Sequence, residues 1–563
     1  MDSIIYPNEQ SVRPSIAVNA VDTDINNSMG DVILLGMADD GIPGKVYTIT
    51  SWEQGKSIFG SGDLVDALEL VFDPYMDVSP SEVLVERVGQ AGQSSMVSGG
   101  LKVLSNSYSN QANNILFRIN QDPTTGNYFV LVNNNGNVTR YNNLGNIFKI
   151  GYTGPYKYAH AKIDADSESS SYGLSIYEGN TENSASLVAY FNFNDSRYYR
   201  LSNIISYINY MQGFSASYYP GTQKNIETKY LDVVPDMDLQ SGQYFTALGG
   251  DIYNSLSESD DVVVTFDLSK GEPKAGDYML AGGYASQEVP GDWSGYLNNL
   301  IDCGGYYLVP LTSDVTIQAQ ALQFCIENES YYYPMTMIVG GDYESNYGYH
   351  ISRAKSLTDS NIKVVVVGAS GRRLMADGRI YHLPGYMLAA QIAGLASALP
   401  IGESIGLHRI NLISADTDYS KEDRDLLSLN GVITVEAVQT DGPYPYRITD
   451  DVTVLAAVTD DPSRMYLSTG EESDYLVREL ATDLANRYIG NSTTSKSPSD
   501  IKAFLTSTLM QMINDKTILD YDQTTLSVVV NGNTVYINID IYISQSTRKI
   551  NIGLNYNLEA TGD

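Results

Sequence analysis

The sequence is poor in residues that hold metals or form disulfides. It has two cysteines, Cys303 and Cys325, and four scattered histidines among 563 residues. One cysteine pair in so long a chain is no disulfide framework, so we expect both to be small core residues in a reducing cytosol. Because the sequence has neither an HExxH motif nor a Cys–His cluster, we predict no metal site and no cofactor.

Positive charge is also scarce. Lys and Arg number 34 against 67 for Asp and Glu, which gives a net charge of −33. A field of that sign repels phosphate backbones and anionic membranes, so we expect no direct nucleic-acid contact and no membrane insertion. The longest apolar stretch, Tyr386–Leu399, is too short to span a bilayer and is typical of a buried helix. Met1–Gln10 lacks a basic start and an apolar run, so no signal peptide is expected.

Motifs for catalysis are missing as well. Asp164–Glu168 lacks the glycine and the final acid of a calcium loop and is interpreted as a solvated acidic loop. Gly368–Arg373 follows a buried strand, but no Gly-Lys-Ser/Thr and no GxGxxG accompanies it. We expect a turn that exposes Arg372 and Arg373 for ion pairing. With no Gly-x-Ser-x-Gly and no ordered Ser, His and Asp, the chain is predicted not to be an enzyme.

The patterns that are present predict a mixed α and β protein. Residues 31–88 read as strand, turn, helix and strand, whereas residues 91–245 are rich in Ser, Asn, Tyr and Gly with short alternating segments, which favours a β-sandwich insertion. From about residue 280, apolar strands at 306–311, 335–339 and 362–367 alternate with helical segments. Such an alternation indicates a parallel sheet covered on both faces.

The last third is predicted to be α+β. Tyr475–Ile489 carries leucines at helical spacing, and Ser497–Pro498 marks the start of a second helix. Thr534–Ile543 then alternates apolar and polar residues at strand spacing.

Both ends of the chain are strand-patterned and lie outside the compact blocks. They can pair with their own sheet, or they can exchange with neighbouring copies by β-augmentation, which produces a helical filament when the contact is heterologous. We predict inter-subunit strand exchange through the apolar positions of both ends: Ile16, Val18, Ala20, Ile550, Ile552, Leu554, Tyr556 and Leu558.

Several segments, in order along the chain, resemble the contractile tail sheath proteins of myovirus-type bacteriophages, with the greatest likeness to those of large lytic phages of Gram-positive hosts. The segments are Gly30–Phe72, Val83–Val88, Gly304–Leu311, Met337–Gly341, Asp377–Arg379 with Pro384 and Tyr386–Leu399, Asn430–Ile433 and Tyr446–Thr453.

The resemblance implies an α+β and α/β multidomain fold. Its parts are expected to be an N-terminal extended arm (1–25), the N-terminal part of a core domain (26–90), an outward β-sandwich insertion (91–245), a subtilisin-like α/β domain (246–410), the C-terminal part of the core (411–543) and a C-terminal strand arm (544–563).

The resemblance also implies a function. Subunits are expected to stack as hexameric rings around a tail tube and to contract, driving the tube through the host envelope for genome ejection. The implied partners are further copies of the chain, the tail tube protein, and the baseplate and tail terminator proteins, in a virion assembled in the host bacterial cytoplasm. Arg372, Arg373, Arg447 and Arg478 are predicted to form inter-subunit ion pairs.

Two other interpretations remain open on sequence alone. The first is a sheath from a related contractile machine, either a tailocin or a secretion system. The second is a β-rich adhesin or secreted enzyme, which the missing signal peptide and missing catalytic residues disfavour.

Overall fold

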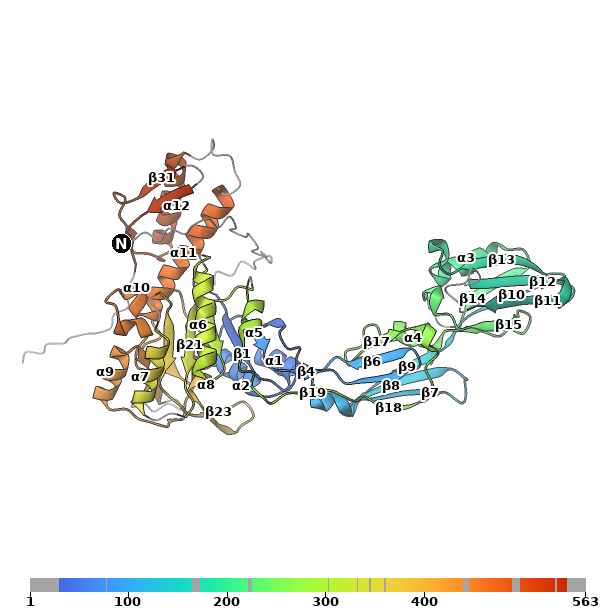
Figure 1. Ribbon diagram of the computed structural model, residues 1–563, viewed down its shortest axis with the longest axis horizontal. Helices are drawn as coiled ribbons and strands as arrows, with labels where there is room; N and C mark the ends of the chain where they lie inside the picture. Colours follow the sequence, from blue (N-terminus) through green and yellow to red (C-terminus); the bar gives the residue numbers. More distant parts are fainter. Residues whose placement is uncertain are drawn as a thin grey trace, which may run out of the picture. The chain divides into compact units, whose positions relative to one another are not determined.

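The computed structural model describes residues 30–543, apart from positions 77, 165–172, 221–224, 302, 332, 344–345, 359–360, 439–444, 489–496 and 532–533. The chain forms two compact units. The first unit holds the described residues up to 38, residues 43–89 and those from 287 onward, and the second unit holds residues 39–42 and 90–286. Figure 1 labels the elements of both units.

The first unit is built on a seven-stranded sheet. Its order is β2 (Val46–Ile49), β3 (Val83–Arg87), β1 (Val32–Gly36), β20 (Tyr307–Pro310), β21 (Thr336–Gly340), β22 (Val364–Val367) and β27 (Val432–Ile433). Neighbouring strands are parallel except for β2, which is antiparallel to β3 at one edge. The expected parallel sheet is therefore present.

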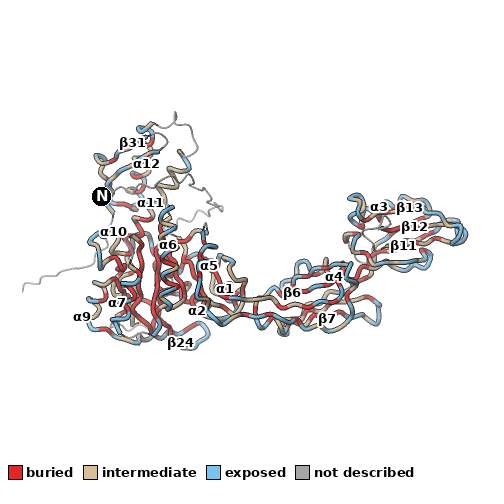
Figure 2. Tube along the Cα trace, viewed as in Figure 1, coloured by how far each residue is buried: buried red, intermediate tan, exposed pale blue. Residues whose placement is uncertain are grey.

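Helices cover both faces of this sheet, and its strands are therefore buried on both sides. In β1, Val32 and Leu34 join the hydrophobic cluster of one face, and Ile33 and Leu35 join that of the other. The first face packs against α1 (Trp52–Phe59), α2 (Asp63–Phe72) and α8 (Gly385–Ala398). The second packs against α5 (Ser294–Asn299), α6 (Val315–Glu329), α7 (Tyr347–Ser356) and α9 (Lys421–Leu429). Figure 2 shows these buried strands in red.

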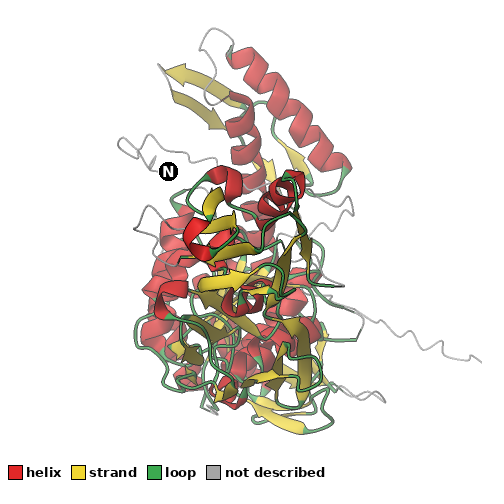
Figure 3. Cartoon of the chain, turned by 90° about the vertical axis from the view of Figure 1, so that its right-hand side faces the viewer, coloured by secondary structure: helices red, strands yellow, loops and turns green. Residues whose placement is uncertain are grey.

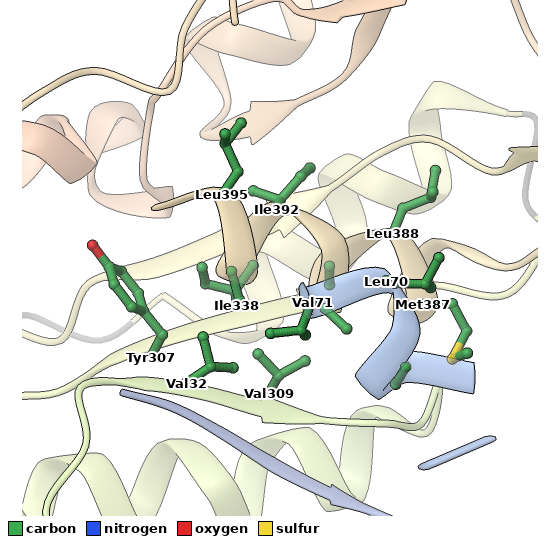
Figure 4. Close-up of a cluster of buried hydrophobic side chains, with 14 of the residues drawn as sticks. Val32, Leu70, Val71, Tyr307, Val309, Ile338, Met387, Leu388, Ile392 and Leu395 are labelled. Carbon is green, nitrogen blue, oxygen red and sulfur yellow. The ribbon is translucent and has the colours of Figure 1, made fainter. Parts of the chain in front are cut away.

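Helix α8 confirms the predicted buried helix at Tyr386–Leu399. Figure 4 shows its Leu388, Ile392 and Leu395 in the cluster that contains Val32 and Ile338 of the sheet. The small residues of α8 have a packing role as well. A Cβ on Gly394 would lie 2.4 Å from the carbonyl oxygen of Val71 in α2, so glycine permits the close approach of these helices.

The strand pairing differs from the domain division expected from the sequence. Strands of the expected core segment 26–90 and of the expected α/β segment 246–410 belong to one sheet, since β1 lies between β3 and β20. This contact joins residues about 275 positions apart, and no local pattern encodes it.

The second unit is β-rich and contains two hydrophobic clusters. One lies among β5 (Ser95–Ser98), β6 (Leu101–Ser105), β17 (Val262–Phe266), β7 (Leu116–Gln121), β8 (Tyr128–Asn134), β9 (Asn137–Leu144), β18 (Gly276–Met279) and α4 (Leu248–Ser255). The other lies among β10 (Asn146–Tyr152), β11 (Tyr158–Ile163), β12 (Gly173–Gly179), β13 (Ser186–Asn192), β14 (Phe214–Tyr218), β15 (Val234–Asp238), β16 (Phe245–Thr246) and α3 (Leu201–Tyr210). β4 (Ala91–Gly92) pairs with β19 (Tyr284–Ala285).

The second unit extends beyond the boundary predicted at residue 245. β17 pairs with β6 and β18 pairs with β7, both antiparallel, so residues 246–286 complete the β-rich unit and do not belong to the α/β part. Each ladder joins residues roughly 160 positions apart, which explains why the composition shift alone misplaced the boundary.

Smaller sheets and the C-terminal elements complete the first unit. The sheets are formed by β23 (Gly371–Leu374), β24 (Ile380–Leu383) and β26 (Ser414–Ala415), and by β25 (Arg409–Ile410), β28 (Val435–Ala437) and β29 (Tyr446–Ile448). The C-terminal elements are α10 (Pro462–Met465), α11 (Leu467–Tyr488), α12 (Pro498–Asn514), β30 (Asp520–Tyr521), β31 (Ser527–Asn531), β32 (Thr534–Asn538) and β33 (Ile541–Tyr542).

The two cysteines differ in burial. Cys325 is buried in α6, as predicted, and burial raises the pKa of its thiol to about 12. Cys303 is exposed, so the prediction that it belongs to the core is wrong. It follows α5 just before the Gly304–Gly305 turn, where its Sγ donates to the carbonyl oxygen of Asn299 (3.2 Å).

Candidate assembly surface

The C-terminal strands form a β-surface that is only partly covered. Val528, Val535 and Ile537 of the β31–β32 hairpin are half-buried against the cluster that includes α12. The opposite face exposes Val529 and its cross-strand partner Tyr536, at 57% and 58%. These elements stand at the top of Figure 3.

Within the described part of the chain, the same strands have edges with no further strand beside them. Among the described residues, β31 pairs with β32 and β30 pairs with β33, and neither pair gains a third strand. A two-stranded sheet is marginal in water, and its free N–H and C=O groups accept a further strand. The geometry therefore suits β-augmentation.

A groove of about 510 Å³ lies beside these strands. Its walls come from the end of the described chain, from α11, from α10 and from the residue before α10. The lining residues are Asp461, Pro462, Ser463, Ser473, Leu476, Val477, Leu480, Ile539, Ile541 and Ile543. This lining combines apolar and polar side chains, and the side chains of an extended strand alternate between its two faces.

The residues predicted to exchange between subunits all lie outside the described residues. They are Ile16, Val18 and Ala20 in the N-terminal arm and Ile550, Ile552, Leu554, Tyr556 and Leu558 in the C-terminal arm. Their strand exchange stays a prediction. The described chain stops at Ile543, which is itself a residue of the groove.

The hairpin was missed in the sequence, although a signal for it was available. Asn531–Gly532 stands between two alternating apolar runs, which is the pattern of a tight β-hairpin. The strand prediction at Thr534–Ile543 covered its second half only.

Arg372 and Arg373 have different environments, although they are adjacent. Neighbouring residues of a strand point to opposite faces, and β23 places Arg373 inside and Arg372 outside. Arg373 is 1% exposed and its Nη2 lies 2.7 Å from Asp73 Oδ2, so the prediction that this residue is exposed is wrong. The Arg372 side chain is half exposed, with Nη1 3.5 Å from Asp416 Oδ1.

Arg447 and Arg478 also have acceptors within the chain. Arg447 Nε donates to Glu436 Oε1 at 2.7 Å. Arg478 Nη2 donates to the Tyr333 hydroxyl at 2.7 Å, and its guanidinium lies 4.3 Å from the centre of the Tyr333 ring. Contacts of these four arginines with a neighbouring subunit stay predictions.

A pair of carboxyl groups lies close to Arg478. Asp31 directly precedes β1, and Glu82 directly precedes β3. Burial, followed by the charge and hydrogen bond of Glu82, raises the pKa of Asp31 to about 7, and Arg478 opposes this rise. The Asp31 carboxyl group is therefore partly protonated near neutral pH.

One arrangement has the residue types of a nucleophilic triad but the wrong order. Asp416 Oδ2 accepts a hydrogen bond from Ser370 Oγ at 2.6 Å and lies 2.6 Å from His382 Nε2. In a triad the imidazole lies between the hydroxyl and the carboxylate, whereas here the carboxylate is central. This cluster therefore places no base on Ser370.

The described part of the chain contains no group of three or more His, Cys, Asp or Glu side chains that could hold a metal ion. No helix among the described residues is long and apolar enough to cross a membrane.

Comparison with known proteins gives full-length matches. The chain is 33% identical over 562 residues to the tail sheath protein of Enterococcus phage phiEF24C, covering 98% of both chains. It is 31% identical over 584 residues to the tail sheath protein of Staphylococcus phage Twort, again covering 98% of each. No protein-family model matches the chain.

Solved structures agree at the level of the fold. The crystal structure of a sheath tail protein from Desulfitobacterium hafniense aligns with a TM-score of 0.54 at 12% identity, covering 96% of this chain and 99% of that one. A sheath tail protein from Listeria innocua also gives 0.54, with 92% of each chain covered. On the strength of the full-length matches, the chain belongs to the family of phage tail sheath proteins, as its sequence predicted.

Proposed function

We propose that this protein is the subunit of a contractile phage tail sheath, and that its terminal arms link neighbouring subunits by strand exchange. Subunits stack as hexameric rings around the tail tube, and their contraction drives the tube through the host envelope for genome ejection. The observation that carries the proposal is the match to named tail sheath proteins over 98% of the chain.

The C-terminal surface supports the strand-exchange part of the proposal. Open strand edges and half-covered isoleucines cost free energy while they face water. A strand from a neighbouring copy would pair the edges and cover the apolar face. Because a strand given by one copy to the next is a heterologous contact, it propagates into a tube.

The remaining partners follow from the same role. The sheath surrounds a tail tube protein and ends at baseplate and tail terminator proteins, and the particle is assembled in the host bacterial cytoplasm. Energy for contraction is stored in the assembled lattice, so the subunit itself hydrolyses no nucleotide.

Electron microscopy of the purified protein at rising concentration tests the proposal. We expect striated tubes or stacked rings from the wild type. A variant that lacks Ile550–Asp563 should remain a folded monomer with unchanged circular dichroism and form no tubes. Tubes of normal length from this truncated protein would refute strand exchange, and the absence of rings or tubes even with added tube protein would refute the sheath role.

Substitutions within the C-terminal arm test which face of its predicted strand is needed for tube formation. Serine at Ile550, Ile552 and Leu554 removes the apolar face, and we expect this variant to form no tubes. Serine at Asn551 and Asn555 alters the opposite face of the same strand and should leave tubes intact. Equal effects of both variants would contradict a face-specific strand contact.

Of the four arginines predicted to form inter-subunit ion pairs, Arg372 provides a direct test, because its side chain is half exposed. Arg372→Glu should weaken assembly without altering the monomer, since it reverses a half-exposed charge at the β23–β24 hairpin. Arg379→Glu is the matched control, because Arg379 lies on the same hairpin and its side chain is 81% exposed. If both variants assemble like the wild type, Arg372 has no inter-subunit role.

A further inference from the structure

A cluster of polar side chains holds the first half of α11 against the sheet. The Tyr306 hydroxyl donates to Asp474 Oδ2 at 2.7 Å, and Thr336 Oγ1 donates to the Tyr306 hydroxyl at 2.9 Å. Lys363 Nζ lies 2.7 Å from Asp474 Oδ1, with both side chains less than a tenth exposed. Tyr306, Thr336 and Lys363 lie at the amino-terminal ends of β20, β21 and β22. The first half of α11 therefore contacts the sheet at these strand ends.

Glu471 lies one turn before Asp474 and is also buried. Its Oε1 accepts a hydrogen bond from the Tyr307 hydroxyl at 2.7 Å, and its Oε2 accepts one from the Gly402 N–H at 3.2 Å. Burial, together with the charges of the nearby Asp474 and Glu472, raises the pKa of Glu471 to about 8, although the hydrogen bonds from Tyr307 and Gly402 oppose this rise. At neutral pH this carboxyl group is therefore mostly protonated.

Arg478 continues the contact one turn further along α11. It binds Tyr333, which precedes β21, and it lies near the Asp31–Glu82 pair at the starts of β1 and β3. Its contacts therefore reach the amino-terminal ends of strands on that side of the sheet.

The charges that face each other in this contact are unbalanced. Lys363 and Arg478 are its cations. The carboxyl groups that face them are Glu471, Glu472 and Asp474 from α11, with Glu479 further along it, and Asp31 and Glu82 from the sheet. Ionisation of them all leaves an excess of buried negative charge, which costs free energy in a low-dielectric site.

The leucine stripe of α11, which starts at Leu476, packs elsewhere. Leu476, Leu480 and Leu484 belong to the cluster formed with α12 and the C-terminal strands, which is separate from the two clusters of the sheet. In addition to Leu467 and the partly buried Tyr475, which pack in a hydrophobic cluster of the sheet, the polar contact of the first half therefore holds α11 on the sheet.

We propose that Asp31, Glu82, Lys363, Glu471, Asp474 and Arg478 form a proton-dependent latch, which holds the C-terminal part of the chain to the sheet when Asp31 and Glu471 are protonated and loosens as these two groups ionise. The latch is a property of the single chain and does not depend on the proposed assembly.

The direction of the pH effect follows from linkage. A free glutamate has a pKa near 4.5 and Glu471 in the latch has one of about 8, so opening releases a proton between these values. The population of the open form should rise by up to tenfold per pH unit in that range because of Glu471. Opening also releases a proton from Asp31 at pH values up to about 7. Above about pH 8, both groups are ionised in the closed form as well, so the population of the open form no longer rises because of them.

Hydrogen exchange of the full-length protein, kept dispersed at low concentration, tests the latch between pH 5.5 and 8.5. After correction for intrinsic exchange rates, the backbone of residues 467–478 should lose protection as the pH rises. Glu471→Gln keeps an acceptor for Tyr307 but cannot ionise, so its protection should be independent of pH between 7 and 8. Glu422→Gln on the exposed first turn of α9 is the control and should behave like the wild type.

The outcomes separate a latch from a purely structural contact. If wild-type protection is independent of pH, or if Glu471→Gln keeps the wild-type slope at lower protection, the latch is refuted. Tyr307→Phe provides a second test, because the lost hydroxyl is a donor that lowers the pKa of Glu471. In the Tyr307→Phe variant, the loss of protection should therefore shift to higher pH. An unshifted profile of protection against pH would also overturn the proposal.

Discussion

The contact between α8 and α2 makes a strong prediction at Gly394. Alanine there would place a Cβ 2.4 Å from the Val71 carbonyl oxygen and 2.7 Å from its Cα. These are backbone atoms, so no side chain can rotate away, and the two helices must move apart by about 1 Å to restore ordinary contact distances. Gly394→Ala should therefore destabilise the first unit.

Two opposing effects set the magnitude. Overpacking a tight core costs about 1–3 kcal/mol, and a clash with backbone belongs at the upper end of that range. Alanine in place of glycine within a helix recovers about 1 kcal/mol. The net loss of unfolding free energy should be about 2 kcal/mol, so the clash outweighs the gain in helix propensity.

Tryptophan fluorescence during urea unfolding provides the assay. The only two tryptophans of the sequence, Trp52 and Trp293, both lie in the first unit, so the signal reports that unit alone. With a urea dependence of about 3 kcal/mol per molar, the midpoint should fall by about 0.7 M.

Gly295→Ala is the matched control. Gly295 lies in α5, where an added Cβ meets nothing within 4 Å. The same chemical change should therefore stabilise the unit by up to about 1 kcal/mol. If Gly394→Ala is neutral or stabilising like the control, the close α8–α2 contact is refuted.

Three further predictions concern other parts of the chain. Lys363→Met should destabilise the first unit by about 3–5 kcal/mol, because it leaves Asp474 buried without a cation, and Asp474→Asn in the same chain should restore most of the loss in urea unfolding. Thiol titration at pH 8 should detect Cys303 at once and Cys325 only after unfolding; rapid reaction of both would contradict the burial of α6. Burial and a neighbouring carboxyl raise the pKa of Glu272 to about 8, so the second unit should become less stable as the pH rises from 4.5 to 8. Exchange of the strand at 276–279 should show that slope, and Glu272→Gln should remove it.

Elements with a strong local pattern were predictable. The apolar run at Tyr386–Leu399 became α8, and the run at 362–367 became β22, because period and apolar content are properties of a few consecutive residues. The second helix of the last third likewise begins at Pro498 after its capping Ser497.

Helix α11 shows where such patterns fail. The leucine stripe predicted a start at Tyr475, but the helix begins at Leu467. Its first two turns carry polar residues, among them Glu471 and Asp474, which look like a solvated segment in the sequence. They are buried because Tyr306, Tyr307 and Lys363, over a hundred positions away, supply their hydrogen bonds and charge.

By itself, the sequence determined many of the helices and strands, which common catalytic and metal-binding motifs are missing, and which family the chain belongs to. Only the tertiary structure decided that β1 joins β3 to β20, that residues 246–286 complete the second unit, and that Arg373 is buried while Arg372 is not. The physical reason is range. Hydrophobic period and turn chemistry act over a few residues, whereas strand pairing, burial and the pKa of a carboxyl depend on partners that the fold brings from distant positions.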